Sequence, residues 1–224
     1  GQPFSMENIR SGSNTCHKYC VFLLLDATRL IENAFFIRER EAGFSKVPLK
    51  NIVRTICDLT DGCTMSSKKD HMVNIGGFLA TNREDVFQKA KELVVIYEGL
   101  HSYGGMAGRD MGALAVGMRE SLECEELVEH YIGQVRYLHD ELAKRGIPVV
   151  NPAGAHAVFV DAKKFFPHVP QEQFPAQTLT AEIYIEGGVR TMERGIVSGQ
   201  HGSEPYEGLE LVRVTIPRRV YELA

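Results

Sequence analysis

The stretch TMSSKKDHMVNIGG, residues 64–77, places two adjacent lysines after two serines and before an apolar run that contains two glycines. Residues 61–65, DGCTM, overlap the start of this stretch and predict a short strand, and NIGGFLAT, which overlaps its end, predicts another. Lys68 and Lys69 therefore fall on the turn between two strands. Two ammonium groups in that place are either both solvated, or one of them is no longer a free ammonium because it takes part in covalent chemistry.

The composition is that of a soluble globular protein. The chain has 224 residues, of which 44% are hydrophobic and 24% are charged, enough for one large domain or two small ones. The formal net charge of -4 offers no basic surface for nucleic acid, and no apolar run is long enough to cross a bilayer. The five cysteines include one pair with zinc-ligand spacing, Cys16 and Cys20, but no second pair completes a site. We therefore expect reduced thiols and a cytoplasmic location.

Alternating helix and strand signals organise the chain. Residues 20–26, CVFLLLD, form a continuous apolar run that ends in an acid, the pattern of a central parallel strand. After residue 145 the elements become shorter, so we expect residues 1–145 to form part of a large α/β domain and residues 146–224 part of a smaller α+β domain. Helical patterns occupy residues 5–19 (with Ser5 as N-cap), 28–41, 49–57, 83–99, 104–123 and 126–146.

Asp26 stands at the carboxyl end of the first predicted strand, where open α/β sheets bind ligands. Alone, this acid would be interpreted as a cap of the following helix, with Arg29 pairing to it on the same helical face. Lys69 follows 43 residues later on a similar turn, three residues after Ser66. A lysine amine can form an imine with the aldehyde of pyridoxal phosphate, and a carboxylate can keep its pyridine nitrogen protonated. The layout therefore indicates the large fold of pyridoxal-phosphate enzymes.

Six longer stretches strengthen that interpretation. They are LLLDATRLIENAFFI, DGCTMSSKKDHMVNIGGFL, KELVVIYEGLHSYGGMAGRDM, AHAVFVDAKKF, QFPAQTLTAEIYIEGGVRTMERGIVSG and VRVTIPRRVY. With them the chain resembles the β-eliminating lyases, the family of tyrosine phenol-lyase and tryptophanase, over nearly all of its length. The resemblance implies an aspartate aminotransferase-like, fold type I enzyme that uses pyridoxal 5'-phosphate, is activated by potassium or ammonium ions and assembles as a homotetramer. It also implies an internal fragment, because the family's N-terminal phosphate-binding loop and the end of its small domain are not matched.

The resemblance assigns the cofactor site. Lys69 would be the lysine that forms the imine, with Lys68 as a charged neighbour that lowers its pKa. Asp26 would hold the pyridine nitrogen. Ser66 would hydrogen-bond the phosphate, and Arg29 would lie near the cofactor's phenolic oxygen or its phosphate.

Three further residues match the family's substrate and cation sites. Arg213, in LVRVTIPRR, corresponds to the arginine that clamps the substrate carboxylate, although without the motif it would be placed on the surface. Asn74, in VNIGG, would offer its backbone carbonyl to a monovalent cation. Arg194, in RTMERG, stands where tyrosine phenol-lyases read the phenolic hydroxyl and tryptophanases carry an apolar residue. A ring without that oxygen would leave the charged donor unpaired. The alternative for Arg194 is an exposed arginine paired with Glu193.

The function implied is the β-elimination of L-tyrosine to phenol, pyruvate and ammonia, with Lys69 removing the Cα proton and Arg194 holding the ring oxygen. The alternatives are tryptophanase, which releases indole from tryptophan, and a fragment of either enzyme without activity. The sequence departs from the family in His101 (usually proline), in Ala155 (usually glycine) and in a shortened stretch between residues 199 and 213. The first and last of these lie where domain closure is expected.

Overall fold

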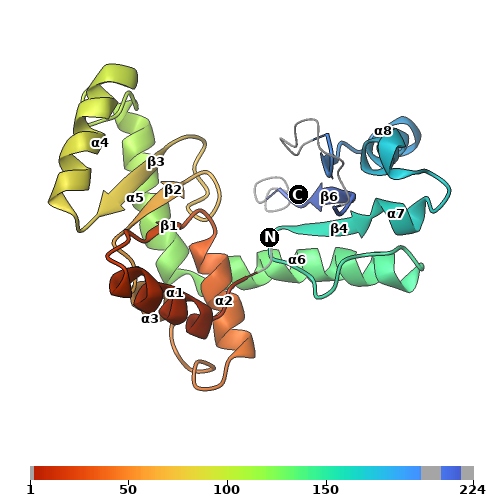
Figure 1. Cartoon of the computed structure of the whole chain (residues 1–224), viewed down its shortest axis with the longest axis horizontal. Coiled ribbons are helices and arrows are strands. Elements are labelled where there is room, and N and C mark those ends of the chain that lie inside the picture. Colours follow the sequence, from red (N-terminus) through yellow and green to blue (C-terminus); the bar gives the residue numbers. More distant parts are fainter. Residues whose placement is uncertain (1–2, 198–207, 218–224) are drawn as a thin grey trace. The chain divides into compact units, whose positions relative to one another are not determined.

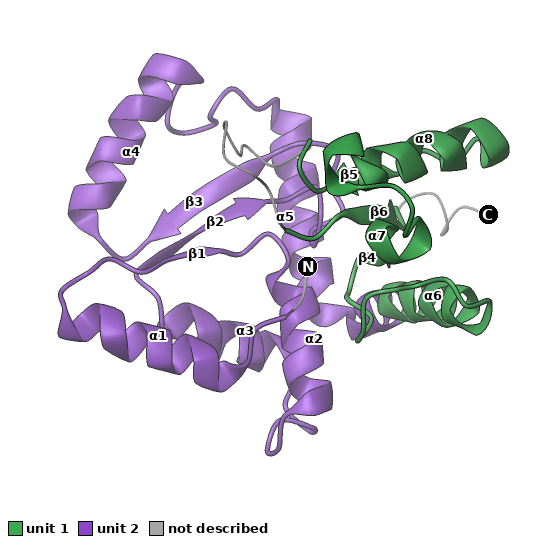
Figure 2. Ribbon diagram, turned by 45° about the vertical axis from the view of Figure 1, so that its right-hand side comes forward, with its two compact units in different colours: residues 1–2, 130–224 green, residues 3–129 purple. Residues whose placement is uncertain are grey.

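The computed structural model of the protein describes residues 3–197 and 208–217 (Figure 1). These residues form two compact units, one made by residues 3–129 and the other by the described residues from 130 onward (Figure 2). The first unit contains the lysine motif, and the second contains Arg194 and Arg213, the two arginines predicted to bind substrate.

The first unit is built on a three-stranded sheet in the order β1-β2-β3. β1 (Leu24–Asp26) runs parallel to β2 (Gly62–Ser66), and β2 runs antiparallel to β3 (Gly77–Thr81). The three strands agree with the sequence, but the prediction that β1 is a central strand is wrong for the described sheet. β2 occupies the middle and β1 lies at the edge, with Leu24 42% exposed. An apolar run indicates that the side chains of a strand are buried, but it does not indicate whether the strand pairs with one neighbouring strand or with two.

Helices flank this sheet, with α1 and α3 on one side of the strands and α4 on the other (Figures 1 and 2). α1 begins where predicted, because Ser5 Oγ accepts a hydrogen bond of 3.0 Å from the amide of Asn8. α2 is buried from Leu30 through Ile37 and forms much of the unit's core. No helix in the described part of the chain is long and apolar enough to cross a membrane. The helices are α1 (Met6–Lys18), α2 (Leu30–Arg40), α3 (Leu49–Asp58), α4 (Glu84–Tyr97), α5 (Gly108–Glu123) and α6 (Glu125–Lys144).

The second unit contains an antiparallel sheet in the order β4-β6-β5. Its core joins Val160 and Val212 of the sheet to Leu179 of α8, and the hydroxyl of Tyr131 on α6 donates a 2.7 Å hydrogen bond to the carbonyl of Ile216. Its elements are β4 (Ala157–Asp161), α7 (Ala162–Phe165), the 3-10 helix η1 (Gln171–Gln173), α8 (Pro175–Gly187), β5 (Met192–Arg194) and β6 (Leu211–Thr215).

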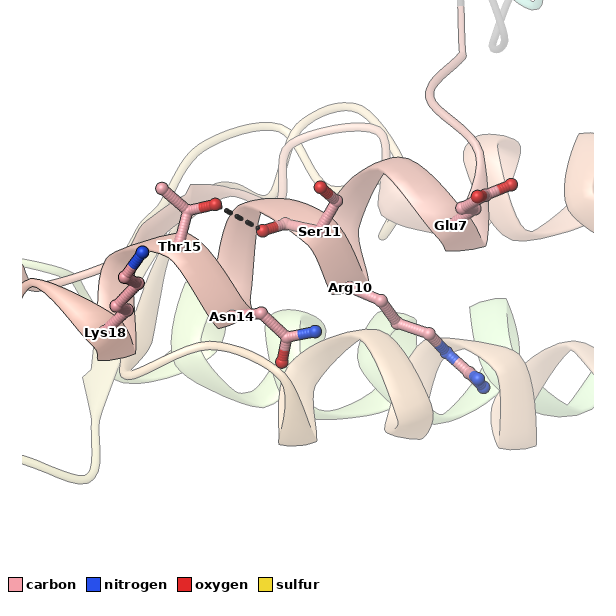
Figure 3. Close-up of a pocket in the computed structure, with 6 residues that line it drawn as sticks. All are labelled: Glu7, Arg10, Ser11, Asn14, Thr15 and Lys18. Atoms are coloured by element: carbon pink, nitrogen blue, oxygen red, sulfur yellow. Dashed lines mark hydrogen bonds between the residues drawn. The ribbon is translucent and has the colours of Figure 1, made fainter.

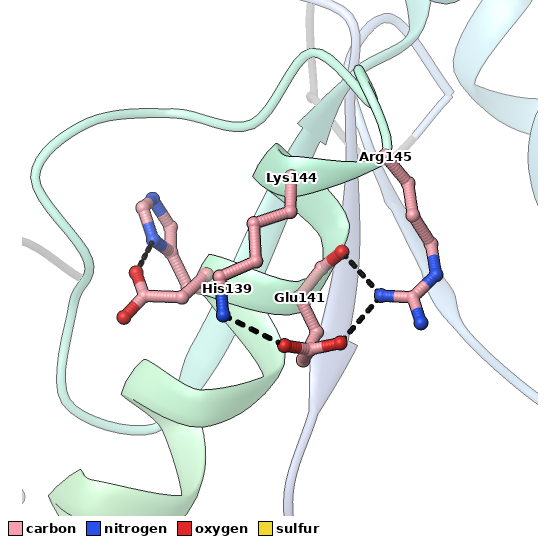
Figure 4. Close-up of polar contacts among 5 residues, drawn as sticks. His139, Glu141, Lys144 and Arg145 are labelled. Atoms are coloured by element: carbon pink, nitrogen blue, oxygen red, sulfur yellow. Dashed lines mark hydrogen bonds and ion pairs between the residues drawn. The ribbon is translucent and has the colours of Figure 1, made fainter.

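The end of α6 is fixed by its own side chains (Figure 4). Lys144 Nζ and Arg145 Nη1 both donate to the carboxylate of Glu141, at 2.9 and 2.6 Å, and Arg145 Nη1 also donates to the carbonyl of Glu141. Basic residues that reach the last carbonyls of a helix are a common way of ending it. The domain boundary predicted at residues 145–146 follows this end, whereas the two compact units divide within α6, so that boundary stays a prediction.

α5 packs directly against the chain that follows the lysine motif. A Cβ atom built on Gly117 would lie 2.2 Å from the carbonyl oxygen of His71 and 3.2 Å from Cγ1 of Val73. One turn further along α5, Ser121 Oγ lies 2.9 Å from Nδ1 of buried His71. A glycine at position 117 therefore allows the helix backbone to approach this turn.

We expect Gly117→Ala to lower the free energy of unfolding of the protein by about 1–3 kcal/mol, because the new methyl group overlaps backbone that cannot move aside. Gly112 on the same helix is the matched control, since it is exposed and a Cβ there meets nothing within 4 Å. Gly112→Ala should instead stabilise the protein by up to about 1 kcal/mol through helix propensity. Urea denaturation measures both, and equal responses of the two glycines would contradict the close packing of α5.

Candidate functional site

The carboxyl ends of β1 and β2 meet at one edge of the first sheet. Asp26 is the last residue of β1, and its Oδ1 accepts a 3.0 Å hydrogen bond from the amide of Thr28. The hydroxyl of Thr28 accepts in turn a 3.2 Å hydrogen bond from the amide of Ser66, the last residue of β2. The loop after β1 is thereby tied to the end of β2, which places Asp26 and Ser66 at the same edge.

The two lysines of the motif have different surroundings. Lys68 is exposed, whereas Lys69 is half-buried and its Nζ donates a 2.8 Å hydrogen bond to Oγ of Ser66. The amide of Ser67 donates to the carbonyl of Gly76 at 3.0 Å, which holds the turn against the start of β3. The hydroxyl of Ser67 is buried and has no partner among the described residues. The turn thus separates a solvated lysine from one that points back to the strand ends.

A buried carboxylate anchors this turn to the neighbouring helix. Asp70 is 1% exposed, and its Oδ2 accepts a 2.8 Å hydrogen bond from the amide of Ile31, in the first turn of α2. The N-cap position of α2 is Arg29, which supplies no side-chain cap, so Asp70 caps the helix from 39 residues away. Sequence reasoning missed Asp70, because a cap supplied from so far along the chain leaves no local pattern.

The surroundings of Lys69 and Asp26, the two residues predicted to contact the reactive parts of the cofactor, shift both of their pKa values. Burial, followed by the nearby charges of Lys68 and Arg29, lowers the pKa of Lys69 below that of an ordinary lysine, against an opposing effect of Asp26. Hydrogen bonds from Thr28, and to a smaller extent the charge of Lys69, lower the pKa of Asp26. More of the Lys69 amine is therefore neutral at a given pH, while Asp26 stays ionised.

Arg29 does not pair with Asp26, and that prediction is corrected. The two residues do not share a helical face, because Asp26 lies in β1 and α2 begins only at Leu30. Arg29 Nη1 instead donates to Oε1 of Glu32 at 2.9 Å, and the Glu32 side chain is 1% exposed. Arg29 still lies close enough to Lys69 to influence its pKa.

Asn74 lies on the exposed segment that joins the lysine turn to β3. Two residues further on, Gly76 has a φ of +108°, and Cε of Met106 would lie 2.7 Å from a Cβ built there. The backbone turns sharply at this point. The cation role of the Asn74 carbonyl stays a prediction.

Arg213 and Arg194 share one face of the sheet in the second unit. On β6, Arg213 lies opposite Phe159 of β4 and Met192 of β5, and its Nη2 donates to Sδ of Met192 at 2.8 Å. Arg194 follows Met192 by two residues and lies opposite Leu211. Side chains two apart on a strand project from the same face, so both guanidinium groups leave the sheet on this side.

The intervening residue of β5 faces the other way. Glu193 is 6% exposed and lies opposite Val212, which belongs to the core of the unit. Strand alternation thus separates Glu193 from the exposed Arg194 and disfavours the alternative of a local ion pair between them.

The departures from the family are placed as follows. His101 is exposed in the turn between α4 and α5, and Ala155 is 4% exposed just before β4. Most of the shortened stretch between residues 199 and 213 lies outside the described residues.

Two surface hollows are lined by none of these residues. One, of about 360 Å³, follows the outer face of α1 and is formed by side chains of that helix alone (Figure 3). Within it Thr15 Oγ1 donates only to the carbonyl of Ser11, at 2.9 Å, so no polar groups from different elements converge there. The other, of about 670 Å³, is open and mostly apolar, and is lined by His130, Gly133, Gln134, Tyr137, Leu138 and Ile216.

All five cysteines are unpaired, and the described residues contain no cluster of three His, Cys, Asp or Glu side chains that could hold a metal ion.

The groups at the edge of the first sheet fit pyridoxal phosphate. Lys69 offers an amine with a lowered pKa, which an aldehyde needs, and Asp26 offers a carboxylate that stays ionised, which a protonated pyridine needs. Ser66 and the buried, unpaired hydroxyl of Ser67 offer donors for a phosphate. These residues come from the ends of two neighbouring parallel strands, where ligands of open α/β sheets bind.

Solved structures with the same fold support the fold class. One is a putative L-allo-threonine aldolase from Listeria monocytogenes, with a TM-score of 0.58 and 19% identity over 97% of this chain and 51% of that one. Another is a serine palmitoyltransferase from Sphingomonas wittichii, with a TM-score of 0.60 and 15% identity over 96% and 47%. The predicted aspartate aminotransferase-like, fold type I architecture is confirmed.

Sequence comparisons identify the family. The family model for the beta-eliminating lyases matches residues 1–223. A tyrosine phenol-lyase from Pasteurella multocida is 55% identical over 100% of this chain and 50% of its own length, and one from Fusobacterium nucleatum is 55% identical over 99% and 49%. The chain therefore spans about half the length of these curated relatives. The protein belongs to the β-eliminating lyase family.

Proposed function

We propose that the intact protein is a pyridoxal-phosphate-dependent carbon–carbon lyase that eliminates phenol from L-tyrosine, leaving pyruvate and ammonia. Family membership and relatives named tyrosine phenol-lyase support this function. The observation that carries the proposal is the arrangement of Lys69, Ser66 and Asp26 at the ends of β1 and β2, with the lysine pKa lowered and the carboxylate ionised.

Four residues would hold the cofactor. Lys69 would bond to its aldehyde carbon, Asp26 would face the pyridine nitrogen, and Ser66 and Arg29 would face the oxygens of the phosphate or the ring. When bound, pyridoxal phosphate supplies an electron sink for the electron pair left on the substrate Cα. Asp26 keeps that sink effective, because an ionised carboxylate holds a proton on the ring nitrogen.

Lys69 is also suited to move the proton of the substrate Cα. A general base works best when its pKa lies near the working pH, and burial together with Lys68 and Arg29 shifts Lys69 in that direction. The hydroxyl of Ser66, 2.8 Å from Nζ, orients the amine relative to the strand ends. Lys68 is exposed, and its contribution is an electrostatic effect on Lys69.

Arg213 and Arg194 would bind the two ends of the substrate. The planar guanidinium of Arg213 is suited to a bidentate contact with the substrate carboxylate. Arg194, on the same face of the sheet, would donate to the phenolic oxygen and so stabilise the ring as it leaves. An indole ring offers no oxygen at that point and would leave the arginine desolvated and unpaired, which favours tyrosine over tryptophan.

The remaining features of the proposal follow from the family resemblance. A potassium or ammonium ion would bind at the backbone carbonyl of Asn74, the intact protein would be a homotetramer, and it would work in the cytoplasm. Asn74 itself is an exposed residue.

Product analysis of the intact protein tests the proposed function. With pyridoxal phosphate and potassium, L-tyrosine should yield phenol and pyruvate in equal amounts, and L-tryptophan should yield far less indole. Release of indole without phenol would make tryptophanase the correct function. The isolated 224-residue chain, tested in parallel, shows whether this part alone is active.

We expect Lys69→Ala to abolish the visible absorption band that arises when pyridoxal phosphate is covalently held by the protein. Lys68→Ala is the matched control and should keep the band. It should, however, take up cofactor more slowly near neutral pH, because loss of the Lys68 charge raises the pKa of Lys69. A band that persists in Lys69→Ala and disappears in Lys68→Ala would reverse the assignment of the two lysines.

Replacement of Arg194 should act on the ring end of the substrate. We expect Arg194→Leu to lower kcat/KM for tyrosine roughly ten- to a hundredfold, the effect of losing a hydrogen bond from a charged group, while activity on tryptophan stays the same or rises. Arg190→Leu removes an exposed arginine from the same segment and should change neither rate. Equal losses on both substrates in Arg194→Leu would mean that Arg194 does not read the ring hydroxyl.

A further inference from the structure

The carboxylate of Glu210 is a buried junction of three chain segments in the second unit. Glu210 is 1% exposed, and its two oxygens accept three hydrogen bonds. Oε1 accepts from Nε2 of Gln171 at 2.9 Å and from the amide of Ile196 at 2.8 Å, and Oε2 accepts from the amide of Ala176 at 3.1 Å. A buried carboxylate that accepts hydrogen bonds from several segments holds those donors in place.

Each donor belongs to a different element. Ala176 is the second residue of α8, so the carboxylate of Glu210 lies at the N-terminal end of that helix. Gln171 begins the 3-10 helix η1 that precedes α8. Ile196 follows Arg194 by two residues, and its amide donates a hydrogen bond to Glu210 just after the end of β5. Glu210 therefore fixes the path of the chain as it leaves Arg194.

Gly195, between Arg194 and Ile196, lies very close to the carboxylate of Glu210. A Cβ atom built on Gly195 would lie 2.4, 2.5 and 2.6 Å from Oε1, Cδ and Oε2 of Glu210. The backbone at Gly195 thus crosses directly over the carboxylate. Both the hydrogen bond to Ile196 and this close approach hold the end of β5 onto Glu210.

Glu210 also lies directly before β6, the strand that carries Arg213. It immediately precedes Leu211, the residue opposite Arg194, and it precedes Arg213 by three residues on β6. Its own carbonyl accepts a 2.9 Å hydrogen bond from the amide of Ala162. The Glu210 side chain consequently joins the end of β5 to the beginning of β6. It thereby links the backbone segments that carry Arg194 and Arg213.

We propose that Glu210 is a positioning residue that sets Arg194 relative to Arg213 and so tunes selectivity for a substrate with a carboxylate at one end and a ring hydroxyl at the other. This role rests on the proposed function, in which those two arginines bind tyrosine. Glu210 does not touch the substrate. It acts through the backbone of residues 195 and 196.

The test compares two substrates in the intact enzyme. L-tyrosine needs Arg194, whereas S-methyl-L-cysteine has a leaving group on Cβ but no ring and does not. We expect Glu210→Gln to lower the ratio of kcat/KM for tyrosine to that for S-methyl-L-cysteine about tenfold or more, mainly through KM for tyrosine. Glu182→Gln, an identical change at an exposed position of α8, should leave the ratio unchanged. A purely structural role would lower both activities together, and an unchanged ratio in Glu210→Gln would overturn the proposal.

A second readout does not depend on catalysis. Hydrogen exchange of the Ile196 amide should be faster in Glu210→Gln than in the unaltered protein, with no change in Glu182→Gln, and unaltered exchange at Ile196 would also overturn the proposal. If the unaltered enzyme releases no phenol from tyrosine, the proposed function fails and exchange alone decides whether Glu210 holds this turn. If Glu210→Gln does not fold, Gly195→Ala replaces it, because its methyl group displaces the carboxylate while the Glu210 side chain is kept. The same loss of selectivity is expected, and an unchanged ratio contradicts the proposal.

Discussion

The hydrogen bond between the carboxylate of Asp70 and the amide of Ile31, 2.8 Å long and buried, is the constraint on which the candidate cofactor site depends. It ties the turn after β2 to the first turn of α2, and α2 follows directly from β1. Breaking it would leave a buried amide unsatisfied at a cost of about 1–3 kcal/mol and would free the turn. With the bond in place, Asp26, Ser66 and Lys69 are held at the same edge of the sheet although they lie far apart in the sequence.

Lys69 and Asp26 need opposite charge states for their proposed roles, a neutral amine and an ionised carboxylate, and their surroundings favour both. In its proposed role Lys69 has to lose a proton near neutral pH, and burial with two cationic neighbours lowers its pKa in that direction. Asp26, as the proposed partner of the pyridine nitrogen, has to keep its charge, and the hydrogen bonds from Thr28 stabilise the ionised form. Arg29 contributes its charge while its own guanidinium is held by Glu32. In the second unit the side chains are sorted by strand alternation. Arg194 and Arg213 lie on one face of the sheet, and Glu193 lies on the buried face.

Much of this could be predicted from the sequence, because it depends on local signals. Helix periodicity and the cap at Ser5 gave α1 its start, and the apolar runs located β1 and β2. The motif around Lys69 located the turn and its lysine. Contacts between distant segments could not be predicted, since nothing local marks Asp70 as a cap of α2 or Glu210 as an acceptor for Ile196. The same limit explains the wrong prediction for β1, because an apolar run does not reveal which strands lie beside it.

In the proposed site Lys69, and not its neighbour Lys68, forms the covalent bond with the cofactor. Borohydride reduction of the intact protein loaded with pyridoxal phosphate, followed by peptide mapping, measures this directly. The turn geometry predicts one phosphopyridoxyl group per chain on Lys69, since Lys69 is half-buried beside Ser66 whereas Lys68 is exposed. A label on Lys68, or labels spread over several surface lysines with none favoured, would contradict the site described for this protein.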